Sequence, residues 1–126
     1  MMSPRTILLV DDMDASRITA KWFLGSFGYQ VECARTAEEA LILFKPQVHD
    51  VVITDNSMPW MSGAEMARII KLRSPLTPII MFSGSPPQDR SCLDIVIQKP
   101  AHLLALKDAL ESVPVQGTAG EKPSAG

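Results

Sequence analysis

The chain has few of the features that mark secreted, membrane-spanning and nucleic-acid-binding proteins. Its two cysteines, Cys33 and Cys92, form no disulfide or metal-ligand pattern, so we expect reduced thiols. No apolar run approaches the roughly 20 residues of a membrane-spanning helix, and the N-terminal apolar stretch is too short for a signal peptide. The formal net charge is −2, and no basic cluster suggests nucleic-acid binding. These absences favour a cytoplasmic protein without membrane insertion or direct nucleic-acid contact.

The remaining composition is that of an ordinary globular protein. The chain has 126 residues, of which 46% are hydrophobic and 21% are charged, enough for one domain with a real core. We expect that domain to occupy residues 1–113. Residues 114–126 are small, polar and rich in glycine and proline, which is typical of a disordered tail.

Strand and helix patterns alternate along the chain. Apolar or alternating runs predict strands at 7–10, 29–34, 51–54, 79–83 and 94–99. Helices are expected after Asp14, after the cap residues Thr36 and Ser62, and over residues 101–113. Alternation of this kind predicts a doubly wound α/β fold, with a five-stranded parallel sheet of order 2-1-3-4-5 and helices on both faces.

Two helices have apolar stripes that we expect to face the core. In the first helix the stripe comprises Ile18, Trp22 and Phe23, with Leu24 or Phe27 further on. In the last helix it comprises Leu103, Leu106 and Leu110.

The connection over residues 84–93 is too short and too rich in proline for a regular helix. Pro86 and Pro87 disfavour helix up to that point, and no apolar stripe follows them. Ten extended residues reach roughly 33 Å, so the connection can close without a helix. We predict that the fourth helix of the alternating pattern is missing or reduced to about one turn.

Polar residues follow the strands at the edge where ligands bind in such sheets. Asp11 and Asp12 end the first strand and Asp55 ends the third, and these strands flank the predicted topological switch point. Ser83 and Lys99 end the last two strands. Three clustered carboxylates need a cation, and oxygen ligands suit Mg²⁺. A metal, a lysine and a hydroxyl around a carboxylate nucleophile are suited to forming an acyl-phosphate.

Four short motifs resemble the receiver domain of bacterial two-component response regulators, which has a flavodoxin-like fold. They are VDD at 10–12, DNSMPWMSG at 55–63, FSG at 82–84 and QKP at 98–100. The resemblance extends from about Arg5 to Val113. It implies a phospho-accepting protein that receives its phosphoryl group from a sensor histidine kinase or a histidine phosphotransfer protein. Such a protein is not an enzyme in the usual sense, although it catalyses its own phosphorylation and dephosphorylation.

The resemblance also implies a role for each site residue. Asp55 would accept the phosphoryl group, and Asp12 and Asp55 would ligate Mg²⁺ directly. The main-chain carbonyl of Ser57 would be a third ligand, and Asp11 would act through water. Ser83 would be the switch hydroxyl. Lys99 would pair with a phosphoryl oxygen, and its peptide bond to Pro100 is often cis in relatives.

The chain departs from this family in two places. Relatives usually have an aromatic residue three positions before the lysine, which swings inward on activation, but this position is Val96. Lys99 comes only 16 positions after Ser83, a shorter step than in typical relatives. The downstream protein and self-association as a homodimer stay open.

Other interpretations of the sequence are weaker. A Mg²⁺-dependent aspartyl-phosphate phosphatase usually has an Asp-x-Asp motif, but Asp55 is followed by Asn56 and Ser57. A pseudo-receiver that binds partners without phosphorylation would not need the complete set of aspartate, serine and lysine. His49 and His102 lack ligand-like spacing, so we expect surface or capping roles for both.

Overall fold

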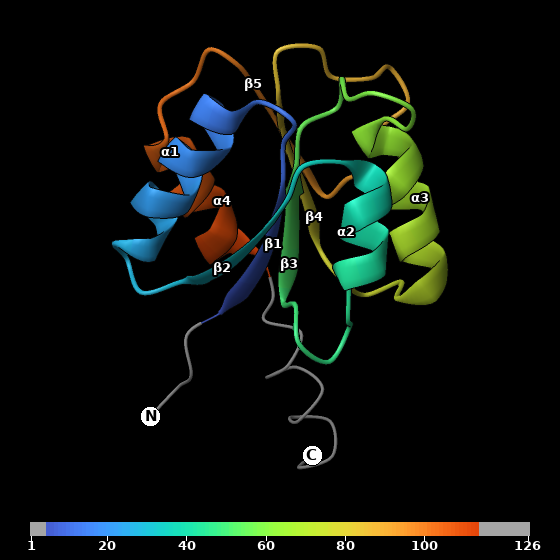
Figure 1. The fold of residues 1–126 in the computed structure, drawn as a ribbon, viewed down its shortest axis with the longest axis horizontal. Coiled ribbons are helices and arrows are strands. Elements are labelled where there is room, and N and C mark those ends of the chain that lie inside the picture. The colour runs from blue at the N-terminus through green and yellow to red at the C-terminus, as the bar shows by residue number, and fades with distance from the viewer. Residues whose placement is uncertain (1–4, 114–126) are drawn as a thin grey trace.

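The computed structural model describes residues 5–113. The elements follow in the order β1 (Thr6–Val10), α1 (Asp14–Gly25), β2 (Gln30–Ala34), α2 (Ala37–Leu43), β3 (Val51–Thr54), α3 (Gly63–Arg73), β4 (Ile79–Ser83), β5 (Ile95–Gln98) and α4 (Leu104–Ser112). The strands are parallel and ordered β2-β1-β3-β4-β5, which confirms the predicted topology. Helices α1 and α4 lie on one side of the sheet, and α2 and α3 lie on the other (Figure 1).

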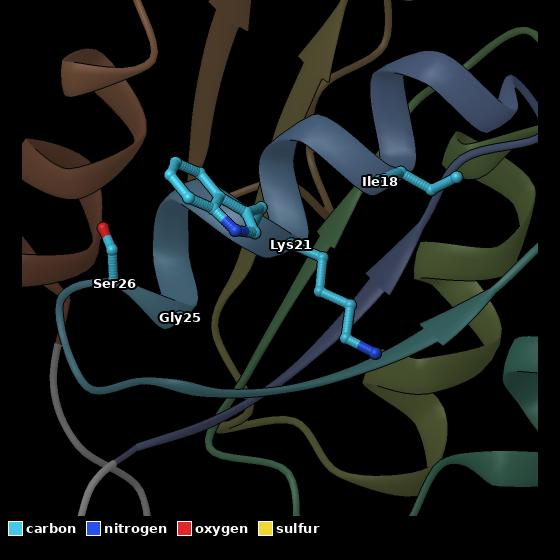
Figure 2. A pocket seen from close by; sticks show the side chains of 5 residues that line it. Ile18, Lys21, Gly25 and Ser26 are labelled. Atoms are coloured by element: carbon cyan, nitrogen blue, oxygen red, sulfur yellow. The ribbon is translucent and has the colours of Figure 1, made fainter.

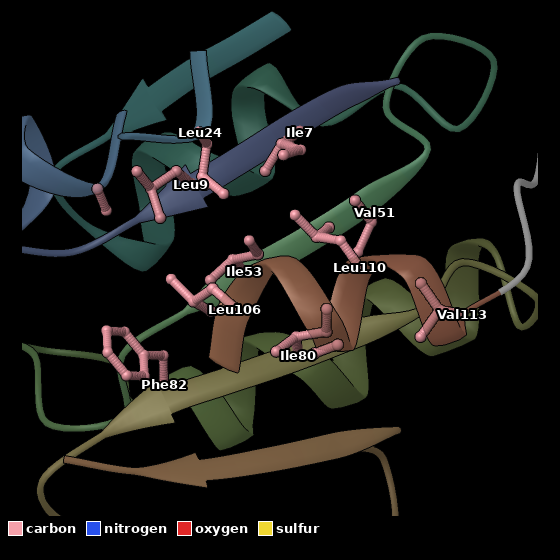
Figure 3. Close-up of a cluster of buried hydrophobic side chains, with 12 residues drawn as sticks. Ile7, Leu9, Leu24, Val51, Ile53, Ile80, Phe82, Leu106, Leu110 and Val113 are labelled. Atoms are coloured by element: carbon pink, nitrogen blue, oxygen red, sulfur yellow. The ribbon is translucent and has the colours of Figure 1, made fainter. Parts of the chain in front are cut away.

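Each face of the sheet has its own apolar core. Strands β1 and β3 have no polar residue in their interiors because they are buried on both faces. On the α1–α4 face, Leu24, Leu106 and Leu110 pack against the sheet (Figure 3). On the opposite face, Met66 and Ile70 of α3 pack with strand residues and with α2.

The predicted stripe of α1 is wrong for Ile18 and Trp22 but right for Leu24, which is buried. Ile18 and Trp22 are 61% and 79% exposed, whereas Phe23 is partly buried against the core. The buried residues of α1 are Arg17, Ala20 and Leu24. Ala20 and Leu24 come three and seven positions after Arg17, so all three lie on one face of the helix. The pattern of large apolar residues failed because the helix turns a small alanine and a hydrogen-bonded arginine toward the sheet.

Cap residues define the starts of α2 and α3 as predicted. The Thr36 hydroxyl accepts a hydrogen bond from the Glu39 amide (3.0 Å). At α3, the Ser62 hydroxyl accepts from the Glu65 amide, and the Glu65 carboxylate accepts from the Ser62 amide, at 3.1 and 2.9 Å. Helix α4 begins at Leu104, three residues later than the predicted 101.

The connection between β4 and β5 has no helix in residues 84–94, all of which the structure describes, so the predicted loss of the fourth helix is confirmed. Cys92 and Leu93 pack against the core on the α2–α3 face. Asp89 pairs with Arg68 of α3 at 3.2 Å. The loop therefore covers its part of the sheet with few apolar side chains.

Both histidines accept main-chain hydrogen bonds. His49 is buried, which excludes the surface position, and its Nδ1 accepts from the Lys45 amide at 3.0 Å. Its Nε2 lies 2.7 Å from Glu32 Oε1. His102 Nδ1 accepts from the Leu104 amide at the start of α4.

Three further expectations concern the cysteines, membrane-spanning helices and the C-terminal tail. Cys33 and Cys92 are free thiols, as predicted. Among residues 5–113, no helix is long and apolar enough to cross a membrane. The predicted tail at 114–126 lies outside the described residues, so its disorder stays a prediction.

Candidate functional site

Three carboxylates meet where β1 and β3 end. The two strands are neighbours, with Val10 beside Thr54, so the residues that follow them emerge at the same edge. One carboxylate oxygen from each of Asp11, Asp12 and Asp55 lies within 4.8 Å of the others. Asp11 is buried, Asp55 is half-buried and Asp12 is exposed. The predicted acidic cluster therefore exists and is open to solvent on one side.

Main-chain amides hold two of these carboxylates in place. Asp11 Oδ1 accepts a hydrogen bond from the Met13 amide at 3.0 Å. Asp55 Oδ1 accepts from the Asn56 amide at 2.7 Å. These bonds leave other oxygen lone pairs of each carboxylate available for a ligand.

The loop from Asp55 to α3 folds back tightly against β3. The Gly63 amide donates to the Asn56 carbonyl at 2.9 Å. A Cβ at Gly63 would lie 2.0 Å from the carbonyl oxygen of Asp55, so only glycine allows this close approach. Within the same loop, Trp60 has a φ of 69° and is 84% exposed.

Lys99 extends from the end of β5 toward the acidic cluster. Its Nζ lies 3.6 Å from Asp11 Oδ2 and donates to Ser16 Oγ at 3.1 Å. The same ammonium lies 5.0 Å from the centroid of the Phe82 ring, a cation–π contact. The Lys99–Pro100 peptide bond is cis, as the resemblance to receiver domains predicts.

Ser83 lies at the same edge of the sheet, at the end of β4. It is buried, and its hydroxyl accepts a hydrogen bond from the Ser85 amide at 3.0 Å. Its carbonyl accepts from the Lys99 amide at 2.9 Å, which ties together the two strand ends. Ser57 is exposed on the loop, two residues after Asp55.

Arg17 also belongs to the surroundings of the site, a role that its sequence pattern did not predict. Its guanidinium is buried and donates to the Asp11 carbonyl at 2.9 Å and to Asp14 Oδ1 at 2.6 Å. The hydrogen bond and charge of Arg17 lower the pKa of Asp14. One sequence signal could have indicated this role: an arginine in the first turn of a helix that follows an acidic pair.

Two shallow grooves lie along α1. One separates α1 from the start of the β5–α4 connection and is lined by Met13, Ser16, Thr19, Phe82, Lys99 and Leu103, among others. The other is formed by α1 alone and includes the exposed Ile18 and Trp22. Figure 2 shows Ile18 and Lys21 projecting from the helix, with Gly25 and Ser26 at its end.

The donor set is suited to a hard divalent cation. All three clustered side chains offer carboxylate oxygens, and the described residues add no cysteine or histidine to this cluster. Mg²⁺ and Ca²⁺ prefer oxygen ligands, and Mg²⁺ retains several waters when only one or two carboxylates bind it. The exposed position of Asp12 leaves room for such waters.

The comparisons with known proteins agree with this fold. The response regulator receiver domain family matches residues 7–111. The autoinducer 1 sensor kinase/phosphatase LuxN of Vibrio harveyi is 32% identical over 110 residues, which cover 83% of this chain and 13% of that protein. The chain thus spans a small part of the length of this relative.

Solved structures show the same similarity. The response regulator TrrA of Thermotoga maritima, in complex with Mg(2+)-BeF, has 30% identity and a TM-score of 0.79, covering 85% of this chain and 96% of TrrA. A receiver domain protein of Clostridium thermocellum has 26% identity and a TM-score of 0.82, covering 93% and 97% of the respective chains. The chain belongs to the response regulator receiver domain family.

Proposed function

We propose that this protein is a phospho-accepting receiver, in which Asp55 takes a phosphoryl group and thereby changes its contacts with other proteins. The observation that carries the proposal is the meeting of Asp11, Asp12 and Asp55 within 4.8 Å, with Lys99 Nζ 3.6 Å from Asp11. Neutralising the charge of a transferring phosphoryl group needs such a combination of metal ligands and a fixed ammonium.

In the transfer step, a carboxylate oxygen of Asp55 attacks the phosphorus of a phosphohistidine. The new O–P bond forms as the N–P bond breaks, and the histidine nitrogen leaves with the electron pair. Lys99 pairs with a phosphoryl oxygen, and the Ser83 hydroxyl donates a hydrogen bond to another. The chain catalyses only its own phosphorylation and dephosphorylation, so it does not act as an enzyme on other substrates.

Mg²⁺ would be held by Asp12, Asp55 and the main-chain carbonyl of Ser57, with Asp11 acting through water. The bound ion would neutralise charge on the phosphoryl oxygens. The oxygen-only donor set and the open side at Asp12 support this assignment.

The proposed donor is a sensor histidine kinase or a histidine phosphotransfer protein in the cytoplasm. The relation to a sensor kinase supports this class of donor. A donor must bring its histidine to the open edge of the sheet, where the groove beside Lys99 offers Met13 and Leu103 for apolar contact. The downstream target is a further protein, reached without direct nucleic-acid contact by this domain.

The test is phosphorylation by a small acyl-phosphate donor such as acetyl phosphate. With Mg²⁺, the intact mass should rise by one phosphoryl group, and chelation of Mg²⁺ should prevent the rise. Asp55→Asn should abolish it, because the amide is not a nucleophile in this reaction. The control is Asp89→Asn, which changes an aspartate of the exposed loop and should leave labelling unchanged. Equal labelling of wild type and Asp55→Asn would refute the proposal.

A further inference from the structure

Asn56 makes hydrogen bonds with four different partners around the acceptor residue. Its amide donates to Asp55 Oδ1 at 2.7 Å, and its carbonyl accepts from the Gly63 amide at 2.9 Å. Its side-chain Oδ1 accepts from the Ala64 amide at 3.1 Å, in the first turn of α3. Its side-chain Nδ2 donates to the Ser85 carbonyl at 2.8 Å, across to the β4–β5 connection.

Ser85 completes a path from the acceptor to the switch hydroxyl. Its carbonyl is held by Asn56, while its amide donates to Ser83 Oγ at 3.0 Å. The path therefore leads from the Asp55 carboxylate through Asn56 and the main chain of Ser85 to the Ser83 hydroxyl. The three hydrogen bonds on this path all have ordinary lengths.

The missing helix makes these two bonds of Ser85 important. Residues 84–94 contain no helix, so no intrahelical hydrogen bonds fix the start of this loop. Pro86 and Pro87 have no amide hydrogen to donate. Farther along, the loop is held by the Asp89–Arg68 pair and by the packing of Cys92 and Leu93. The position of its first residues then depends on what holds Ser85.

We propose that Asn56 is a positioning residue that couples the Asp55 carboxylate to the Ser83 hydroxyl and to the loop 84–93 through the main chain of Ser85. The inference rests on the proposed function, because it assigns Ser83 a role toward the phosphoryl group. When the Ser83 hydroxyl turns to that group, the Ser85 amide loses its acceptor while Asn56 still holds the Ser85 carbonyl. The loop then pivots at Ser85 and stays attached to Asn56. The effect of phosphorylation thereby reaches the surface formed by residues 84–93, which has no helix.

The experiment measures hydrogen exchange of the Ser85 amide by NMR in the full chain, first without any ligand. Asn56→Ala removes the bond to the Ser85 carbonyl, and Ser83→Ala removes the acceptor of the Ser85 amide. Each change should accelerate exchange at Ser85 by about fivefold or more, the equilibrium effect of losing one ordinary hydrogen bond. In the double variant, the acceleration of Ser85 exchange should be smaller than the product of the two single accelerations, because both changes release the same residue. Ser85→Ala is the matched control, since it keeps both main-chain bonds and should leave exchange within about twofold of wild type.

Asn56→Asp provides a second variant in case Asn56→Ala does not fold. The carboxylate keeps an oxygen that can accept from the Ala64 amide but has no hydrogen for the Ser85 carbonyl. It should accelerate Ser85 exchange as Asn56→Ala does. Unchanged exchange in a folded Asn56 variant, or multiplicative effects in the double variant, would overturn the inference.

The second arm adds Mg²⁺ and beryllofluoride, a stable analogue of the phosphoryl group. In wild type, amide shifts should spread from residues 55–57 into residues 85–93. In Asn56→Ala, the shifts at residues 88–93 should fall at least threefold while those near Asp55 remain. Equal shifts in both proteins would overturn the coupling. If wild type shows no response at residues 55–57, the proposed function fails, whereas the ligand-free exchange result still tests the contact of Asn56.

Discussion

Gly63 offers a sharp test of how tightly the loop from Asp55 to α3 packs against the end of β3. A Cβ added there would lie 2.0 Å from the carbonyl oxygen of Asp55 and 3.0 Å from Thr54 Oγ1. The Thr54 hydroxyl donates to that same carbonyl oxygen at 2.7 Å, so neither atom can move without breaking this bond. The closest obstacle is main chain, which no side-chain rotation can clear.

The size of the clash sets the expected cost of Gly63→Ala. A carbon and a carbonyl oxygen approach to roughly 3.3 Å in proteins, so the Asp55 carbonyl and the start of α3 must separate by more than about 1 Å. Overpacking of this kind usually costs about 1–3 kcal/mol, and we expect about 3 kcal/mol because the backbone has to shift. The same shift strains the Gly63–Asn56 hydrogen bond and displaces Asp55.

Urea unfolding followed by circular dichroism measures this cost, and intact mass after acetyl phosphate treatment measures acceptor function. Gly25→Ala is the matched control, because a Cβ at Gly25, in the last turn of α1, meets nothing within 4 Å. It should raise the free energy of unfolding by about 0.5–1 kcal/mol. If Gly63→Ala unfolds within about 0.5 kcal/mol of wild type and accepts phosphate at the wild-type rate, the close approach at Asp55 is wrong.

Three further predictions concern the metal, the phosphoryl lifetime and acid. Asp12→Ala should weaken Mg²⁺ binding, measured by calorimetry, by roughly 100-fold, because a direct carboxylate ligand is lost. Ser85→Ala should change the half-life of the phosphorylated protein by less than about tenfold, since a serine hydroxyl is a poor acid or base near neutral pH. Hydrogen bonds from Ser91, and then the contact with Arg68, lower the pKa of Asp89 from 3.8 to about 2. Its contribution to stability is therefore present above about pH 4 and is lost as the pH falls toward 2. An NMR titration of Asp89 with a midpoint near 4 would contradict this pKa.

The sheet and the acidic cluster could be predicted because they follow from strong local patterns. Buried parallel strands are short apolar runs, and the rule for strand ends then brings Asp11 and Asp55 to one edge. Ser83 and Lys99 followed from the same rule, and the structure places them at that edge with Lys99 near Asp11. The lost helix was also predictable, since two prolines in a ten-residue connection leave little room for one.

The contacts that support the site could not be predicted in this way. The buried face of α1 depends on the bond from Arg17 to the Asp11 carbonyl, and an arginine in a helix pattern normally indicates the exposed side. Asn56 is an ordinary loop residue by composition, and its partner Ser85 is 29 positions away. His49 is buried because Lys45 and Glu32 satisfy both ring nitrogens, a fact of tertiary structure.

Val96 limits the structural changes that could transmit the proposed phosphorylation. It pairs with Met81 in the sheet, while its neighbours Ile95 and Ile97 face the α1–α4 core, so Val96 lies on the opposite face. A valine has two heavy atoms on Cβ and is restricted at χ1, so it cannot swing between exposed and buried positions as an aromatic ring can. Any signal that starts at Asp55 must then move main chain instead of one ring. The loop after β4 contains no helix, and Asn56 joins it directly to Asp55, the proposed acceptor.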